Sequence, residues 1–149
     1  MDTLDCTCIV DLGKLRDYAE DWEKLRQECG GSVFTSYYLS KAWLEAFKSA
    51  ASPCIIVLEE AGEVVGIAPL ITKRQAFASI PVRALSLIGD ADQKLALDPL
   101  RLLVSPGRPD VMDRLIAAAG RQWWNLLNIN YLQDCVETRQ LIEQVKRTW

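Results

Sequence analysis

The amino-acid sequence predicts a mixed α/β fold, in which a mainly antiparallel sheet carries helices on both faces. Two observations predict it. Several segments repeat apolar residues at three- and four-residue spacing, which is typical of helices that bury one face. Between them lie short β-branched or continuous apolar runs, typical of strands, and the two patterns do not alternate strictly. At 149 residues the chain matches one domain, because two halves would each be short of core.

The first third of the chain predicts one strand followed by two helices. Residues 7–10 form a short β-branched run. The apolar residues after it share one helical face, which predicts a helix over 14–29, and Gly30-Gly31 are typical of a helix end. A second helix is predicted over 36–50. Its inward stripe is expected at Leu39, Trp43, Ala46, Phe47 and Ala50.

The middle of the chain predicts three strands. Residues 54–58 and 64–72 are apolar runs on either side of a short acidic turn, which favours an antiparallel hairpin. Gly66 and Pro69 lie inside the returning strand and indicate a bulge or an edge, because proline cannot donate to a ladder. A third strand over 82–88 is expected to continue the same sheet.

The last part of the chain begins with an irregular stretch, 90–109, that is rich in Asp, Pro and Gly. A helix is predicted over 110–120, and its inward face is expected at Val111, Leu115, Ile116 and Ala119. A strand is predicted over 125–130 and a final helix over 134–147. The final helix opens with Asp-Cys-Val-Glu, which has the form of a capping box. The sequence shows no internal repeat and no second domain.

Composition excludes several classes of function. The chain has no histidine, which removes Ser-His-Asp and Cys-His nucleophiles and histidine metal sites. The net charge of -3 argues against nucleic acid or an anionic membrane surface as a partner. No uncharged stretch is longer than 122–133, and this stretch is shorter than the roughly 20 apolar residues of a membrane span. The acidic start does not have the order of a signal peptide, so we expect a cytoplasmic location.

The five cysteines form an odd and scattered set, which indicates reduced thiols rather than a disulfide framework. Cys6 and Cys8 could bind a soft metal ion through their thiolates, but a four-ligand site would need further thiolates from distant parts of the chain. Small apolar side chains flanking a first strand are the favoured interpretation, and no metal site is expected.

Four stretches of the sequence resemble one branch of a known superfamily. They are 32–36 leading into 43–44, then 63–70, 85–89 and 123–129. The second is the most specific, because Glu-Val-Val-Gly-Ile-Ala-Pro-Leu holds both Gly and Pro in a strand that follows an acidic turn. The order of elements is similar to that of the GCN5-related N-acetyltransferases. The local sequence is more similar to the acetyltransferases related to the cellulose-biosynthesis protein CelD and to the FemAB peptidyl transferases.

This resemblance implies a two-half architecture, in which the chain is the N-terminal half and a cofactor-using half lies C-terminal to it. In such enzymes acetyl-CoA binds a glycine-rich loop whose bare amides face the pyrophosphate at a helix N-terminus. The corresponding stretch here offers Gly89 and Gly107, eighteen residues apart, and no such motif. Pro106 and Pro109 remove two donors, and Asp110 adds a negative charge, so a capped turn is the favoured interpretation of this stretch. We therefore expect no cofactor in this chain, although acetyl-CoA is implied for the full architecture.

Candidate site residues are few. Asp90, Asp92 and Asp98 follow the third strand, where they could bind a substrate amine or act as a base, although solvated turn residues are the commoner interpretation. The resemblance places Tyr131 where many acetyltransferases hold a general acid. The tryptophans could stack a ring-shaped ligand, but helical spacing predicts Trp22 and Trp43 in the core and leaves one of Trp123 and Trp124 exposed.

Two hypotheses for function follow. The first is an acetyltransferase-like domain that forms the substrate-side, cofactor-poor half of an acyltransferase and is inactive as an isolated chain. The alternative is a non-catalytic dimerising or partner-binding module. Either the missing half or a second copy of the chain is the expected partner, because the resemblance implies two further strands and an unpaired strand edge is an association site.

Overall fold

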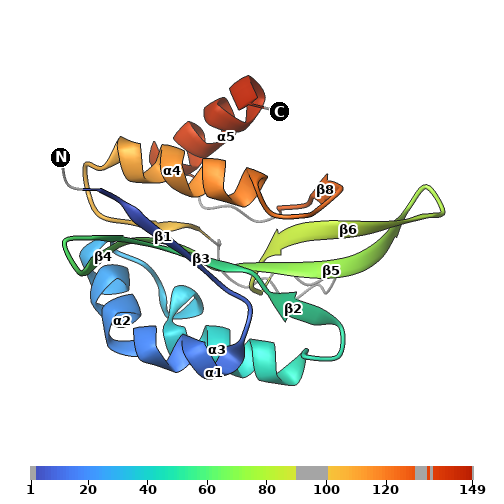
Figure 1. The fold of residues 1–149 in the computed structure, drawn as a ribbon, viewed down its shortest axis with the longest axis horizontal. Coiled ribbons are helices and arrows are strands. Elements are labelled where there is room, and N and C mark those ends of the chain that lie inside the picture. The colour runs from blue at the N-terminus through green and yellow to red at the C-terminus, as the bar shows by residue number, and fades with distance from the viewer. Residues whose placement is uncertain (1–2, 90–100, 130–133, 135, 149) are drawn as a thin grey trace.

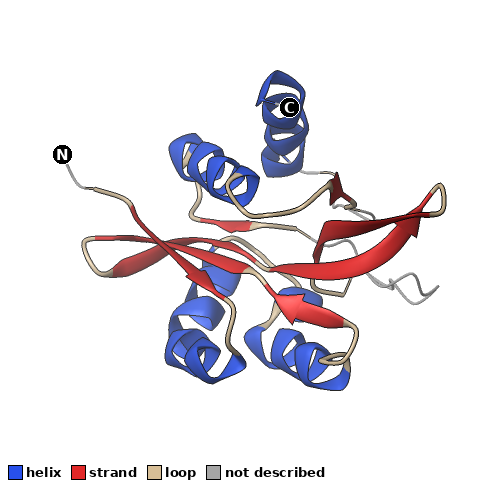
Figure 2. Ribbon diagram, turned by 45° about the vertical axis from the view of Figure 1, so that its right-hand side comes forward, coloured by secondary structure: helices blue, strands red, loops and turns tan. Residues whose placement is uncertain are grey.

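The computed structural model describes residues 3–89, 101–129, 134 and 136–148. Strands form a central layer, with helices packed on both of its faces (Figures 1 and 2). Every strand pair is antiparallel except one, the pair between β6 and β8, within the described residues. The predicted fold class, a mixed and mainly antiparallel sheet covered by helices on both sides, is confirmed.

The first third of the chain forms a strand and then a helical layer on one face of the sheet (Figure 1). Its elements are β1 (Asp5–Ile9), α1 (Leu12–Leu15), the 3-10 helix η1 (Arg16–Tyr18), α2 (Ala19–Glu28), the 3-10 helix η2 (Val33–Thr35) and α3 (Tyr37–Ala46). The single helix expected over 14–29 is therefore interrupted by a 3-10 turn. The side chain of Ser36 caps α3 by accepting a hydrogen bond from the backbone N–H of Leu39 at 3.2 Å.

The inward face of α3 differs from the predicted one. The buried residues are Tyr37, Ser40 and Leu44, whereas Leu39 and Phe47 are exposed to 41% and 40%. The helix is apolar on more than one side, so spacing alone did not define a single stripe. The stripe predicted for the preceding helical segment is confirmed, since Leu15, Trp22 and Leu25 are fully buried.

The strands form two ladders, β1-β3-β4-β7 and β2-β5-β6-β8. Their bounds are β2 (Ala51–Pro53), β3 (Ile55–Glu60), β4 (Glu63–Ala68), β5 (Leu70–Phe77), β6 (Ile80–Leu87), β7 (Leu103–Val104) and β8 (Leu126–Leu127). The sequence predicts one returning strand over 64–72 in one continuous sheet, and this is corrected. Pro69 divides that strand into β4 and β5, which belong to different ladders, because proline cannot donate to a ladder.

The two ladders stay joined through backbone hydrogen bonds at the division. The N–H of Cys54 donates to the carbonyl of Leu70 at 2.9 Å, and that of Ile88 donates to the carbonyl of Pro69 at 2.8 Å. The predicted bulge is present beside Gly66, where the register of β3 against β4 shifts between Leu58 and Glu59. Residues 51–53, which follow the helix predicted over 36–50, form the edge strand β2.

Strands β7 and β6 pair with the consecutive strands β4 and β5. Both run antiparallel to the β4–β5 line, β6 beside β5 and β7 beside β4. Residues 88–102 separate β6 from β7 in the sequence, and α4 (Pro109–Gly120) follows β7 after a four-residue turn. After α4 the chain returns as β8, parallel to β6, and ends in α5 (Val136–Thr148). This crossover places the N-terminus of α4 at the end of a strand, which is a common location for sites in α/β proteins.

Helix α4 packs directly on the sheet beside Gly66. A Cβ atom added to Gly66 would lie 2.5 Å from Cγ1 of Val111 and 3.3 Å from Cδ1 of Leu115. A glycine is therefore required here for close contact between helix and strand. The predicted inward face of α4 is confirmed, because Val111, Leu115, Ile116 and Ala119 are all buried.

Candidate functional site

The junction between β7 and α4 lies where the resemblance places a cofactor loop. Val104 ends the strand, and the next four residues form a tight turn before the helix starts at Pro109. Gly107 has a φ of +74° and follows Pro106, an order typical of a turn that needs a left-handed residue. The turn predicted for this stretch is thus present.

Arg108 is the central side chain of this junction. Its guanidinium donates to both carboxylate oxygens of Glu60, at 2.7 and 3.0 Å, and to both of Asp110, at 2.9 and 2.8 Å. Glu60 comes from the end of β3, and Asp110 lies in the first turn of α4. The planar guanidinium suits such paired bonds, and here it is shared between two carboxylates.

The charges of this cluster hold one another in the ionised state. Hydrogen bonds from Arg108 lower the pKa of both Glu60 and Asp110. The same hydrogen bonds raise the pKa of Arg108, and those that it donates to Asp110 have a larger effect than those that it donates to Glu60. All three groups are therefore charged at neutral pH, and one guanidinium faces two carboxylates. The cluster carries a net negative charge at the start of α4.

Helix α5 covers the junction from the other side. The side-chain amide of Gln140 donates to the carbonyl of Pro109 at 3.1 Å. A cavity of about 210 Å³ remains between the two helices, and Met112, Val136 and Gln140 contribute to its lining with the junction residues. Hydrogen bonds thus connect the start of α4 to α5 through Gln140 and to β3 through Glu60.

The residues at this junction do not fit a pyrophosphate. Pro106 and Pro109 supply no N–H, and the N-cap residue Arg108 makes no side-chain cap bond. The arginine that could attract an anion already binds two carboxylates. Bare amides at a helix N-terminus are what a phosphate requires, and here prolines and a net negative charge occupy that place.

The sequence-predicted candidates are placed as follows. Asp90, Asp92, Asp98 and Tyr131 all lie outside the residues that the structure describes. Among the tryptophans, Trp22 is fully buried, Trp43 is partly buried against the same core, and Trp123 is 76% exposed while Trp124 is partly buried. The prediction that one of the adjacent pair is exposed is confirmed.

The thiols of Cys54 and Cys8 have surroundings that disfavour the reactive thiolate form. Burial raises the pKa of the Cys54 thiol to about 12, and burial also raises the pKa of its neighbour Cys8. Cys6 is exposed.

Over 3–89, 101–129 and the described part of the C-terminal segment, no three His, Cys, Asp or Glu side chains converge as metal ligands would. Within those same residues, no helix has the length and apolar character needed to cross a membrane.

Sequence reasoning missed two arrangements. It placed Asp110 at the helix start but not Glu60, which lies 48 residues before Arg108 and reaches it only through the fold. It also missed a cluster of cations where α3, β2, β5 and β6 meet. Part of the signal for the second was visible in the sequence, because Lys73 and Arg74 are adjacent cations directly after the strand predicted over 64–72.

Comparison with solved structures identifies the class of fold. A ribosomal-protein-alanine N-acetyltransferase from Brucella melitensis biovar Abortus 2308 superposes with a TM-score of 0.53 and 17% identity, covering 96% of this chain and 90% of that one. A probable acetyltransferase superposes with a TM-score of 0.57 and 14% identity, covering 95% of this chain and 87% of that one. No family model and no curated protein matches the sequence.

The chain therefore has the fold of the GCN5-related N-acetyltransferases, as the resemblance implied. At this level of identity the likeness establishes the fold and no activity. The finer assignment to the CelD and FemAB branch stays a prediction.

Proposed function

We propose that this chain is the substrate-side, cofactor-poor half of an acyltransferase, and that a second half supplies the acyl donor site. The observation that carries the proposal is the Arg108 cluster. In this fold the start of α4 is the place for acetyl-CoA, and the cluster fills it with two carboxylates and one neutralised guanidinium. The acyl donor is then held elsewhere, and this half shapes the cleft for the acceptor.

The architecture supports a role in shaping a cleft. Residues 88–102 connect β6 to β7 in the sequence, and segments that follow strands often carry binding residues in α/β proteins. That stretch includes Asp90 and Asp92, which stay the candidate acceptor-binding residues together with Tyr131. Because the four cysteines that the structure describes are free thiols, we also propose a reducing, cytoplasmic setting for the domain.

Titration with acetyl-CoA tests the proposal directly. We expect the chain to bind acetyl-CoA with a dissociation constant weaker than about 10 μM, because two amide donors are missing and the cluster is negative. Isothermal titration calorimetry measures this value. A dissociation constant at or below about 10 μM would show that the junction accepts the cofactor and would refute the proposal.

A matched variant separates the two causes of exclusion. The double variant Glu60→Gln/Asp110→Asn keeps the shape of both side chains and removes their charge, which frees the Arg108 guanidinium. If the carboxylates dominate, this variant binds acetyl-CoA more tightly than the natural chain. Equal weakness in both proteins would assign the exclusion to Pro106 and Pro109.

A second candidate function, a dimerising or partner-binding module, is favoured by exposed apolar residues on α5. Val136 and Ile142 are exposed to 77% and 43%, whereas Leu141 of the same helix is buried. The strand β8 pairs with β6 on one side, and it is the last strand of its ladder within the described residues. A second copy of the chain, or the other half of the enzyme, would cover the apolar residues of α5 and the outer edge of β8.

For this second candidate we expect the chain to self-associate, with a C2 dimer as the simplest symmetric form. Sedimentation equilibrium at high micromolar concentration measures the mass. Replacing Val136 and Ile142 by serine should return the protein to a monomer without unfolding it, since both side chains are exposed. A natural chain that is monomeric at this concentration would contradict the dimer.

A further inference from the structure

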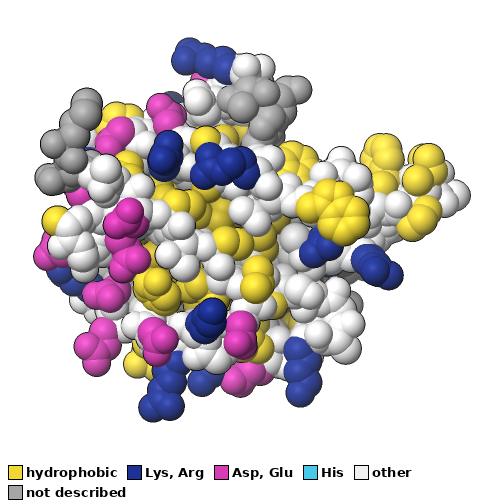
Figure 3. All heavy atoms as spheres, in the orientation of Figure 1, with side chains coloured by type: hydrophobic (Ala, Val, Ile, Leu, Met, Phe, Trp, Pro, Cys, Tyr) yellow, Lys and Arg dark blue, Asp and Glu magenta, His cyan; other side chains and the backbone are white. Residues whose placement is uncertain are grey.

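A second cavity lies on the opposite side of the fold from the β7–α4 junction, where the β5–β6 hairpin leaves the body of the protein. Its volume is about 310 Å³. Cations and hydroxyl groups from four segments line it, including Lys48, Ser52, Thr72, Arg74 and Arg83. Figure 3 shows Lys and Arg side chains gathered near the base of this hairpin, with hydrophobic side chains at its projecting tip.

The strand register brings two arginines of this cavity together. Arg74 on β5 pairs directly with Arg83 on β6, so their side chains share one face of the sheet. Thr72, two residues earlier on β5, lies on that same face, and its cross-strand partner on the edge strand is Ser52. Like charges directly opposite on neighbouring strands are destabilising unless an opposite charge lies between them.

Arg83 is held in place on both its backbone and its side chain. The carboxamide oxygen of Asn125 accepts from the N–H of Arg83 at 3.0 Å, and the N–H of Asn125 donates to the carbonyl of Arg83 at 2.8 Å. The guanidinium lies 5.1 Å from the ring centre of Trp123 and donates to the hydroxyl of Thr72 at 3.4 Å. These contacts orient the guanidinium before any ligand arrives.

The cavity has cations without matching carboxylates. Among the residues that the structure describes, no carboxylate lies within ion-pair distance of Lys48, Arg74 or Arg83. The chain as a whole is acidic, with 20 carboxylate side chains against 17 basic ones. Within the part of the chain that the structure describes, Lys48, Arg74 and Arg83 therefore give this cavity a local excess of positive charge that an anion would neutralise.

We propose that this cavity binds a phosphate monoester. Two arginine forks and one ammonium group match the oxygens and the double charge of a phosphate better than they match a single carboxylate charge. The hydroxyls of Ser52 and Thr72 can donate to further phosphate oxygens. The volume leaves room for the organic part of the ligand. The proposal is independent of the β7–α4 junction, so either can fail alone.

Titration with inorganic phosphate and with glycerol 3-phosphate tests the proposal on the natural chain. At pH 7.5 and constant ionic strength, we expect both to bind with a dissociation constant of about 1 mM or tighter. Acetate is expected to bind at least about tenfold more weakly, since it has one charge. Backbone amide shifts in NMR spectra measure each affinity and show where the ligand binds.

The variant Arg74→Gln provides the site-specific test, because Arg74 is exposed and its loss leaves the fold intact. We expect it to weaken phosphate binding about tenfold, the effect of removing one charge-assisted contact. Arg83→Gln should do the same. Arg121→Gln removes an equal exposed charge outside the cavity and should leave the affinity within about twofold.

Vesicles distinguish the source of the phosphate. The hairpin tip carries exposed Phe77 and Ile80, so a lipid headgroup is one possible source. Retention on vesicles of phosphatidylcholine with phosphatidic acid, lost in Arg74→Gln, would identify a lipid phosphate. Binding of glycerol 3-phosphate without such retention would identify a soluble one. The proposal is overturned if neither phosphate probe binds up to about 10 mM, if acetate binds equally well, or if Arg74→Gln changes nothing.

Discussion

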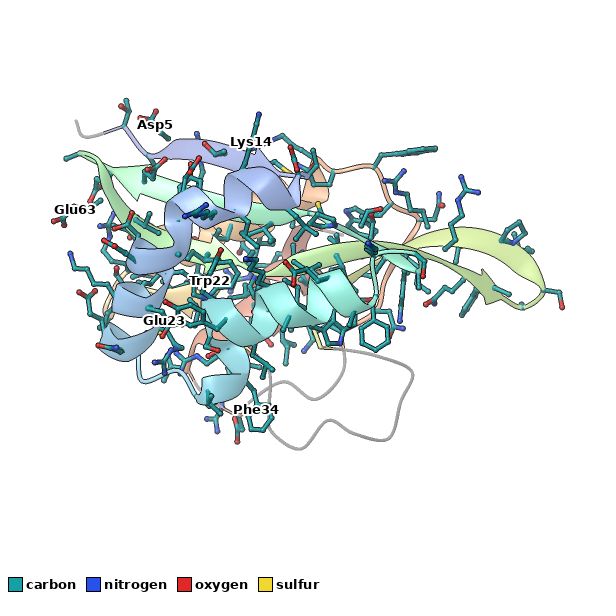
Figure 4. The ribbon with its side chains drawn as sticks, turned by 90° about the horizontal axis from the view of Figure 1, so that it is seen from below. Asp5, Lys14, Trp22, Glu23, Phe34 and Glu63 are labelled. Carbon is teal, nitrogen blue, oxygen red and sulfur yellow. The ribbon has the colours of Figure 1, made fainter. Side chains whose placement is uncertain are left out.

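Replacing Trp22 by alanine should destabilise the protein by about 3–5 kcal/mol, a large part of the stability of a domain this size. Trp22 is fully buried between α2, α3 and the sheet (Figure 4). Its indole N–H donates to the carbonyl of Thr35 at 2.9 Å, and its ring meets that of Tyr37 edge-on at 6.2 Å. The substitution leaves a cavity and an unpaired carbonyl. Urea denaturation followed by circular dichroism measures the change.

Two further variants separate the contribution of the indole N–H from that of the buried ring and supply an exposed control. Trp22→Phe keeps an aromatic ring and removes the N–H donor, so its loss of stability should fall between those of the natural chain and of Trp22→Ala. Trp123→Ala is the matched control, because this tryptophan is 76% exposed and its loss should change stability by no more than about 1 kcal/mol. Equal losses for Trp22→Ala and Trp123→Ala would contradict the packing described.

Replacing Leu115 by alanine should destabilise the protein by about 2–5 kcal/mol. Leu115 is fully buried in the core between α4 and the sheet, where it packs beside Gly66. Its loss opens a cavity at the closest contact of helix and strand, and a β-sheet backbone cannot easily collapse into it. The free energy of unfolding from urea denaturation is again the measurement.

The control for this prediction is Leu39→Ala. Helical spacing placed Leu39 inward, but the structure leaves it 41% exposed on α3, so its loss should change the free energy of unfolding by about 0.5 kcal/mol or less. The pair therefore tests a confirmed and a corrected prediction in one experiment. A larger loss for Leu39→Ala than for Leu115→Ala would show that the helix faces are assigned wrongly.

Helix faces could be predicted where one face is clearly polar. In α4, charged residues such as Asp113 and Arg114 lie between the apolar positions, so the inward stripe was unambiguous. In α3, alanine, tryptophan, leucine and phenylalanine surround the helix, and the true face includes a buried serine, Ser40. Local spacing cannot choose between several apolar faces, because tertiary packing decides which one is covered.

The candidate site could be predicted only as far as local sequence reaches. Pro106, Gly107 and Pro109 predicted a turn without a cofactor loop, and the structure has that turn. The bonds from Arg108 to Glu60 depend on how β3 and α4 meet, which no local pattern contains. The position of Arg74 directly opposite Arg83 likewise depends on the register of β5 against β6, which no local pattern contains. The division of the sheet at Pro69 was predicted as an irregularity but not as a change of ladder.

The central claim is that the start of α4 does not accept an acyl-CoA pyrophosphate. Backbone amide signals of Ser105, Gly107 and Arg108 report on it directly, because these N–H groups lie between and beside the two prolines. With acetyl-CoA added to about 1 mM, we predict that these signals show no shift that saturates with a dissociation constant at or below about 10 μM. Shifts of these three signals that saturate with such a dissociation constant would contradict the account, because they would place the cofactor at the junction.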